Sequence, residues 1–239
     1  MKLRGKFLAL CLALTLMHRL PAVLAAAADS YAAAREEMVA RQLKGRDIAD
    51  PRVLAAMAKV PRHLFVPERL ASHAYGDHPL PIGCGQTISQ PYIAALMSQW
   101  AEVKPGDRVL EVGTGSGYQA AVLAELTDQV FTIELLPELA RQAAGRLAAL
   151  GYNRIQVTCG DGYQGWPQQA PFAAILVTAA APRVPEALAA QLAEGGRLVI
   201  PLGAPETGQI LVRLRKVQGK LQEEAALPVR FVPLVQPKK

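Results

Sequence analysis

The chain has 239 residues, 51% of them hydrophobic, which is enough to bury one sizeable core and makes a single domain the default. Its formal net charge is +6, but four of the 26 basic residues lie within residues 1–28, where there is no acid, so 26 minus 4 leaves 22 basic against 20 acidic residues. This small excess forms no basic run and only 5% of residues are aromatic, which argues against a nucleic-acid-binding surface.

The N-terminus has the pattern of a secretion leader. Three basic residues among the first six precede the apolar run Phe7–Met17, and the small residues Ala25–Ala28 follow. The apolar run is shorter than the roughly 20 residues of a membrane-spanning helix, and it has no polar face to place in water. We therefore expect residues 1–28 to be a signal peptide, the mature protein to be periplasmic or secreted, and no stable membrane anchor. The alternative is an uncleaved, cytoplasmic protein.

Residues 29–106 are expected to form N-terminal helices and a long loop. The expected helices are Ser30–Lys44, Asp50–Val60 and Pro91–Ala101, and the loop-rich stretch, dense in Pro and Gly, runs from Pro61 to Gln90. In the second helix Asp50 can cap the N-terminus, and Pro51 suits the first turn, where no backbone donor is lost.

From Asp107 onward, short apolar runs alternate with helical segments. The expected strands are Arg108–Val112, Val130–Ile133, Ile155–Thr158, Ala174–Thr178 and Arg197–Pro201. The helices between them are expected at Ala120–Leu126, Pro137–Leu150 and Pro185–Ala193, and a terminal antiparallel pair at Ile210–Val217 and Lys220–Val229. This alternation predicts an α/β fold with a doubly wound, mostly parallel, seven-stranded sheet. Residues 107–239 are then the cofactor-binding core of one domain, residues 29–239.

A glycine-rich turn ends the first of these strands. It reads Glu111, Val112, Gly113, Thr114, Gly115, Ser116, Gly117. Glycines let the backbone turn sharply and approach a ligand closely. The next strand leads into Glu134, where an acid can accept hydrogen bonds from ribose hydroxyls. Together these features predict a nucleoside-containing cofactor, although a merely tight strand–helix turn is the simpler alternative.

The spacing of the glycines narrows the choice of cofactor. Dinucleotide sites use G-x-G-x-x-G, whereas this turn has G-x-G-x-G preceded by Glu111, which can hold a cationic amino group. No P-loop lysine follows, which disfavours phosphoryl transfer. A methionine-derived tail, as in S-adenosyl-L-methionine, fits better than a pyrophosphate. Asp161 and Gly162, after the third expected strand, can form the adenine side of the site or a simple Asp-Gly turn.

The segment Pro79–Pro91, called the acceptor loop below, reads PLPIGCGQTISQP. It closely resembles the signature loop of the protein-L-isoaspartate O-methyltransferase family. The resemblance extends from about Met38 to the C-terminal end and includes Val109–Leu123, Gly160–Trp166, Pro171–Pro182 and Val229–Leu234.

The resemblance implies methyl transfer from S-adenosyl-L-methionine to the free α-carboxyl group of L-isoaspartyl residues in damaged proteins and peptides. We also expect a monomer. Family roles fall on residues of this chain as follows: Ser89 and Thr87 catalytic; Ile88 and Gln86 substrate-binding; Glu111, Gly113, Thr114, Gly115, Gly117, Glu134, Asp161 and Gly162 cofactor-binding. Ser89 also has a simpler interpretation as a helix cap, because it lies two residues before Pro91. One departure is Ala173, where the family pattern has Asp, and it places local hydrogen bonding or activity in question.

Several alternatives stay open at this stage. The chain can be another S-adenosyl-L-methionine methyltransferase, or a scaffold that binds the cofactor without catalysis. His63, His73 and His78 lack metal-ligand spacing and are expected to be ordinary surface or loop residues, so no metal is predicted. Cys84 and Cys159 would form a disulfide only in an oxidising compartment and at a suitable separation; two unpaired thiols are the safer assumption.

Overall fold

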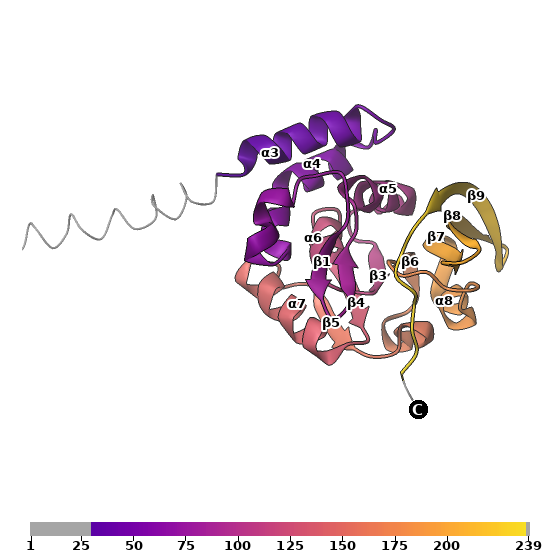
Figure 1. Cartoon of the computed structure of the whole chain (residues 1–239). Coiled ribbons are helices and arrows are strands. Elements are labelled where there is room, and N and C mark those ends of the chain that lie inside the picture. The colour runs from indigo at the N-terminus through magenta and orange to yellow at the C-terminus, as the bar shows by residue number, and fades with distance from the viewer. Residues whose placement is uncertain (1–29, 238–239) are drawn as a thin grey trace, which may run out of the picture.

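A seven-stranded sheet forms the centre of the molecule in the computed structural model, which describes residues 30–237 (Figure 1). The expected signal peptide lies outside the described residues. The strand order is β5-β4-β3-β6-β7-β8-β9. Their bounds are β3 Arg108–Val112, β4 Gln129–Glu134, β5 Gln156–Cys159, β6 Phe172–Val177, β7 Leu192–Ala204, β8 Gly208–Val217 and β9 Lys220–Val229. The first five strands in this order are parallel, and β8 and β9 are antiparallel, which confirms the predicted sheet.

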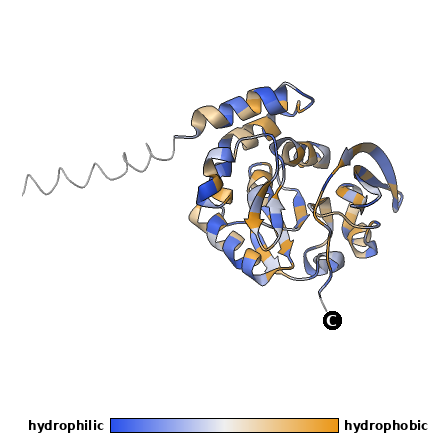
Figure 2. Cartoon of the chain, in the orientation of Figure 1, coloured by the Kyte–Doolittle hydropathy of each residue, from blue (hydrophilic) through white to orange (hydrophobic). Residues whose placement is uncertain are grey.

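Helices cover both faces of the sheet because alternate strand residues point to opposite sides. In β3, Val109 packs in one core cluster and Leu110 in the other. The helices in the α/β half are α6 Tyr118–Ala124, α7 Pro137–Ala149 and α8 Glu186–Gln191, with short 3-10 turns η4 Gly162–Gln164 and η5 Pro167–Gln169. Figure 2 shows hydrophobic residues gathered in the central strands, while the outer helices carry hydrophilic and hydrophobic residues in alternation.

The N-terminal residues form a helical cap beside the sheet, as expected. Its elements are α3 Ala32–Glu37, the π-helix η1 Met38–Lys44, α4 Pro51–Lys59, the 3-10 helices η2 Arg62–Phe65 and η3 Glu68–His73, and α5 Pro91–Ala101. The cap at Asp50 is present, since its Oδ1 accepts from the Arg52 amide at 2.8 Å.

The long loop is more ordered than the sequence predicts. Besides η2 and η3, it contains an antiparallel hairpin of β1 Leu80–Gly83 and β2 Gln86–Ile88. Three residues in succession at its turn have positive φ: Gly83, Cys84 and Gly85 at 99°, 50° and 70°. The strands have only four and three residues, and β1 contains a Pro and a Gly, so no alternating apolar and polar pattern predicts them.

Strand β7 is also longer than expected, since it begins at Leu192 rather than Arg197. The pair Gly195-Gly196 reads as a turn in the sequence. In the structure Gly196 lies so close to the strand β6 backbone that a Cβ there would stand 2.8 Å from the Ala173 carbonyl oxygen. Register with β6 shifts at this point, so the glycines absorb an irregularity within the strand.

The chain order places a binding site between β3 and β6. From β3 the chain builds outward through β4 and β5, then returns to β6 on the other side of β3. At such a switch point the loops beyond the carboxyl ends of the strands part and leave a crevice. Within residues 30–237 no helix is long and apolar enough to cross a bilayer.

Candidate active site

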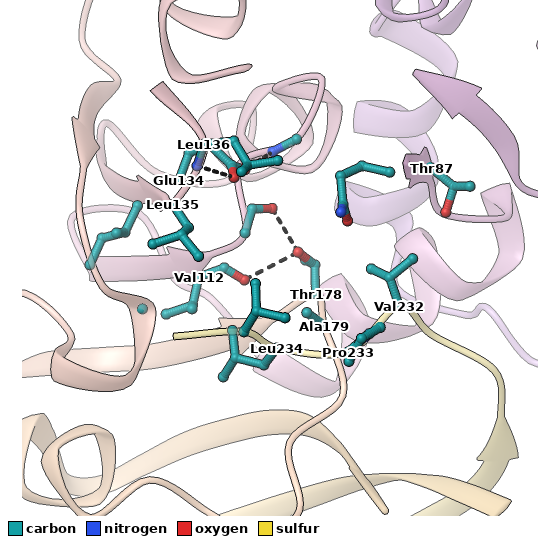
Figure 3. A pocket seen from close by; sticks show the side chains of 16 residues that line it. Thr87, Val112, Glu134, Leu135, Leu136, Thr178, Ala179, Val232, Pro233 and Leu234 are labelled. Atoms are coloured by element: carbon teal, nitrogen blue, oxygen red, sulfur yellow. Dashed lines mark hydrogen bonds between the residues drawn. The ribbon is translucent and has the colours of Figure 1, made fainter. Parts of the chain in front are cut away.

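The glycine turn connects β3 to α6 at this crevice. Gly113, Gly115 and Gly117 have φ values of 98°, 52° and 89°, in the region that side chains disfavour. A Cβ on Gly113 would collide with Thr178 Oγ1, whose hydroxyl donates to the Gly113 carbonyl oxygen at 2.6 Å. Figure 3 shows Thr178 bonded to Val112 and the turn beside it. The turn can therefore pack this closely against the end of β6 only because Gly113 has no side chain.

Glu111 lies beneath the turn and is fully buried. Its Oε2 accepts from the Thr132 hydroxyl at 2.6 Å, and the Thr114 hydroxyl lies 2.6 Å from the same Thr132 oxygen. Its Oε1 has no partner within the described part of the chain. Burial raises the pKa of Glu111 to about 8; the Thr132 hydrogen bond opposes this rise and the charge of Glu134 adds to it. An orphaned buried carboxylate oxygen of this kind suits a cationic ligand group.

Glu134 ends β4 and joins the glycine turn to the next loop. Its Oε2 accepts from the Gly115 amide at 2.8 Å and its Oε1 from the Leu136 amide at 3.0 Å. Figure 3 shows this carboxylate on the wall of the pocket, opposite Val232 and Pro233. Each carboxylate oxygen keeps a lone pair for a ligand hydroxyl. The predicted ribose acid is thus rigidly placed at the pocket wall.

Asp161 and Gly162 lie after β5, at the same edge of the sheet. Asp161 Oδ1 accepts from the Tyr163 amide at 2.9 Å, which is the simple turn that the sequence also allowed. Gly162 borders the pocket, and a Cβ there would collide with Val112 Cγ1. Of this pair, it is Gly162 that lines the cofactor pocket.

A C-terminal segment closes the other side of the pocket, and the sequence analysis did not identify it as part of the site. Residues Val232–Leu234, called the strap below, run beside the end of β6: Ala180 donates to the Val232 carbonyl oxygen at 2.8 Å, and Leu234 donates to that of Ala180 at 2.7 Å. Figure 3 shows Val232, Pro233 and Leu234 facing the pocket from this side. The Tyr163 hydroxyl also donates to the Leu234 carbonyl oxygen.

The acceptor loop lies against the glycine turn. A Cβ on Gly115 would stand 3.2 Å from Ile82 Cδ1. Ile88 is 4% exposed and packs in the core, which anchors the loop, while Thr87 is exposed and Gln86 half-buried. All three residues border the site.

Ser89 is half-buried at the point where the acceptor loop meets α5. The N-cap of α5 is Gln90 and has no side-chain cap bond, so the helix-cap interpretation of Ser89 is wrong. Within the described residues the Ser89 hydroxyl has no hydrogen bond at all. Its backbone is held instead: buried Arg62 donates to the Ser89 carbonyl oxygen at 2.6 Å and to that of Ala74 at 2.7 Å. The Ser89 backbone is therefore held in place, while its hydroxyl is free to bond a ligand.

Three adjoining hollows make up the site. The cofactor pocket lies between Glu134 and the strap, an inner hollow leads to Glu111, and an outer groove runs between the acceptor loop and the end of β9. Thr87 and Thr178 border all three, and Ser89 borders the inner hollow and the groove. Thr178 was not predicted to be a site residue. The sequence signal for it is a polar residue at the carboxyl end of a parallel strand, where such folds bind ligands.

Other residues singled out in the sequence lie outside these hollows. His63 is 8% exposed, stacks on Tyr31 and bonds the Tyr75 hydroxyl at 2.8 Å, so the expectation of a surface or loop residue was wrong. Cys84 and Cys159 are exposed and unpaired. Among residues 30–237 no group of His, Cys, Asp or Glu could hold a metal ion.

Ala173 is also remote from the chemistry. It lies near the start of β6, whereas the site is at the other end of the strand, about 13 Å away at 3.3 Å per residue. The missing aspartate therefore removes no group from the pocket wall.

The sheet order, the glycine turn and the two acids define a class: the fold is that of a Rossmann-like methyltransferase, and the two acids are placed as expected for a site that binds S-adenosyl-L-methionine. A family model described as protein-L-isoaspartate(D-aspartate) O-methyltransferase matches residues 33–239. The chain belongs to that family.

Individual relatives and structures agree with this assignment. The chain is 57% identical over 216 residues to the protein-L-isoaspartate O-methyltransferase of Synechococcus sp. (strain JA-2-3B'a(2-13)), a match that covers 87% of this chain and 88% of the relative. It is 52% identical to protein-L-isoaspartate O-methyltransferase 2 of Shewanella sediminis (strain HAW-EB3), with 96% and 95% covered. A crystal structure of a β-aspartate methyltransferase from Plasmodium falciparum in complex with S-adenosyl-L-homocysteine superposes with a TM-score of 0.73 at 28% identity, covering 85% of this chain and 99% of that one.

Proposed function

We propose that this chain methylates the free α-carboxyl group of L-isoaspartyl residues in proteins and peptides, with S-adenosyl-L-methionine as donor. The observation that carries the proposal is the meeting of the three hollows at Thr87 and Thr178, with the unbonded Ser89 hydroxyl between two of them. A donor in the pocket and an acceptor in the groove would meet at this point.

The residues present fit the donor. Gly113 and Gly162 bring the backbone to the pocket at positions where a Cβ would collide with Thr178 or Val112. Glu134 can accept from ribose hydroxyls, and Glu111 Oε1 is an orphaned acceptor for a cation. When bound, the donor supplies an electrophilic methyl group on a sulfonium. The protein's part is to hold that group at the open end of the pocket, beside Thr87.

The acceptor needs positioning rather than activation. The pKa of an α-carboxyl group is about 3.5, so the nucleophile is already ionised at neutral pH and no general base is required. Ser89 can donate a hydrogen bond to one carboxylate oxygen and orient the other toward the pocket. Arg62 fixes the Ser89 backbone from beneath, so the alignment is set before the acceptor binds.

The test is a methylation assay on matched isoaspartyl and aspartyl peptides with three forms of the protein. Wild type should methylate only the isoaspartyl peptide. Ser89→Ala should keep its melting temperature and lose about tenfold or more in kcat/KM, as expected for a hydrogen bond to a charged group. Ser72→Ala, at an exposed serine of η3, serves as the control and should match wild type. Unchanged kinetics in Ser89→Ala would remove Ser89 from the mechanism.

The same assay separates the remaining alternatives. Methylation of both peptides, or of neither, while the donor still binds in calorimetry would favour a different acceptor or a non-catalytic scaffold.

We also propose that the mature protein is an exported monomer. The proposal of export rests on the basic and apolar order of residues 1–28. The monomeric state is a separate expectation that does not follow from this order. N-terminal sequencing of protein purified from cells, with sizing by light scattering, tests it: an intact Met1 or a dimer would contradict it. Export would leave the source of the donor to be found, because this family's cofactor is made inside cells.

A further inference from the structure

The outer groove is mostly apolar but has a basic residue, Arg230, among those that line it. Its walls are mainly apolar, formed by Pro79 and Ile93 on one side and by Pro228, Val229 and Phe231 on the other. Among the described residues that line it, Arg230 is the only charged one and none is acidic.

The Arg230 side chain is exposed and makes no ion pair or hydrogen bond within residues 30–237. Other arginines of the neighbouring strands are paired; Arg213, for example, lies 3.0 Å from Glu224. Arg230 is thus an uncompensated cation beside the position where an acceptor carboxylate is expected.

The backbone around Arg230 is fixed, although its side chain is free. Val229 pairs with Gln209 in the sheet, and the Gln209 side chain accepts from the Phe231 amide at 2.6 Å and donates to the Phe231 carbonyl oxygen at 3.2 Å. The guanidinium therefore extends from a fixed backbone position at the rim of the groove. A charge that discriminates between peptides needs such a fixed position.

We propose that Arg230 selects among acceptor peptides, favouring those with an acidic side chain near the isoaspartyl residue. This inference rests on the proposed function. The groove walls take the apolar parts of the peptide, and the guanidinium pairs with a Glu or Asp carboxylate within about three residues of the methylated one. The contact is partly solvated, so its effect is small and falls with ionic strength.

The experiment uses isoaspartyl peptides that differ at one flanking position, which carries Glu, Gln or Lys, tested on both sides of the isoaspartyl residue. With wild type, kcat/KM should be about two- to fivefold higher for Glu than for Gln at one or more positions, and lowest for Lys. Arg230→Gln should abolish the difference between Glu and Gln, and Arg230→Glu should reverse the order. The control is Arg154→Glu, which makes the same charge change at a residue paired with Asp128, and it should keep the wild-type order.

Two results would overturn the inference. Equal kcat/KM for all peptides with wild type would mean that Arg230 does not select. A uniform loss for every peptide in Arg230→Gln would mean that the guanidinium binds the reacting α-carboxylate instead. In both cases isoaspartyl peptides are still methylated, so the proposed function stands; no methylation of any peptide would overturn the function and this inference together.

Discussion

Replacing Glu111 with Gln should remove a coupling between pH and two properties, stability and donor binding. The carboxyl group is fully buried, and one of its oxygens has no partner among residues 30–237. Within residues 30–237 one charged group acts on its pKa: Glu134 raises it, and no cation in this part of the chain offsets the rise. In the absence of donor we therefore expect the group to be mainly neutral at pH 7, below its raised pKa of about 8.

The size of the stability effect follows from the pKa. Burial raises it from an ordinary 4.5 to about 8, and at 1.36 kcal/mol per pH unit this corresponds to at most about 5 kcal/mol. Between pH 4.5 and 8 the folded state holds a proton that the unfolded state has released. The free energy of unfolding should therefore fall as pH rises through this window and level off above pH 8. In Glu111→Gln the contribution of this group to the slope disappears.

Donor binding should reverse the shift, because a bound cation favours the ionised carboxylate. At pH 7 a group of pKa near 8 is about nine-tenths protonated, so binding should release close to one proton. Calorimetric titration with S-adenosyl-L-methionine in phosphate and in Tris, which differ in ionisation enthalpy, measures that number. Affinity should rise as pH increases toward 8, by up to about tenfold per unit.

The reasoning would be refuted by two results together: no difference in binding enthalpy between the buffers, and the same pH profile in wild type and Glu111→Gln. S-adenosyl-L-homocysteine, which lacks the sulfonium charge but keeps the ammonium group, serves as the comparison ligand. Equal proton release with both ligands would assign the effect to the ammonium group.

Two further substitutions test the walls of the cofactor pocket. Gly113→Ala should cost about 1–3 kcal/mol of stability and weaken donor binding at least tenfold, because the new Cβ would collide with Thr178 and the residue has a φ of 98°. The matched control is Gly145→Ala, where a Cβ meets nothing within 4 Å. It should leave donor binding intact and raise the melting temperature. Gln209→Ala should raise the donor Kd in calorimetry by releasing the backbone that precedes the strap, and exposed Gln222→Ala should not; equal Kd values for the two variants would show that the Gln209–Phe231 hydrogen bonds do not affect donor binding.

The features that the sequence predicted correctly are those with local signals. A strand, a glycine turn and a helix follow one another at Arg108–Ala124, and Glu134 is the last residue of the next strand. The glycine turn and Glu134 could therefore be placed without knowing the order of the strands in the sheet. The parallel sheet follows from the same alternation of apolar strands and helices. Local chemistry was enough for these elements.

The features that were missed depend on contacts between distant residues. Thr178 reaches the glycine turn only because β6 pairs with β3, and the strap reaches the pocket only through Ala180. For Ser89, which the resemblance predicts to be catalytic, only the alternative helix-cap interpretation was wrong, because the N-cap of α5 is Gln90. Neighbouring residues in the sequence do not determine which strands pair, and they do not determine which group a hydroxyl bonds.

The central claim is that one pocket holds the donor so that its methyl group faces an acceptor carboxylate at Ser89. The most direct measurement is a crystal structure with S-adenosyl-L-homocysteine and an isoaspartyl peptide bound together. We expect the ribose at Glu134, the sulfur beside Thr87 and the peptide α-carboxylate within hydrogen-bonding distance of the Ser89 hydroxyl. A peptide carboxylate seated away from Ser89, or a donor outside the crevice between β3 and β6, would contradict it.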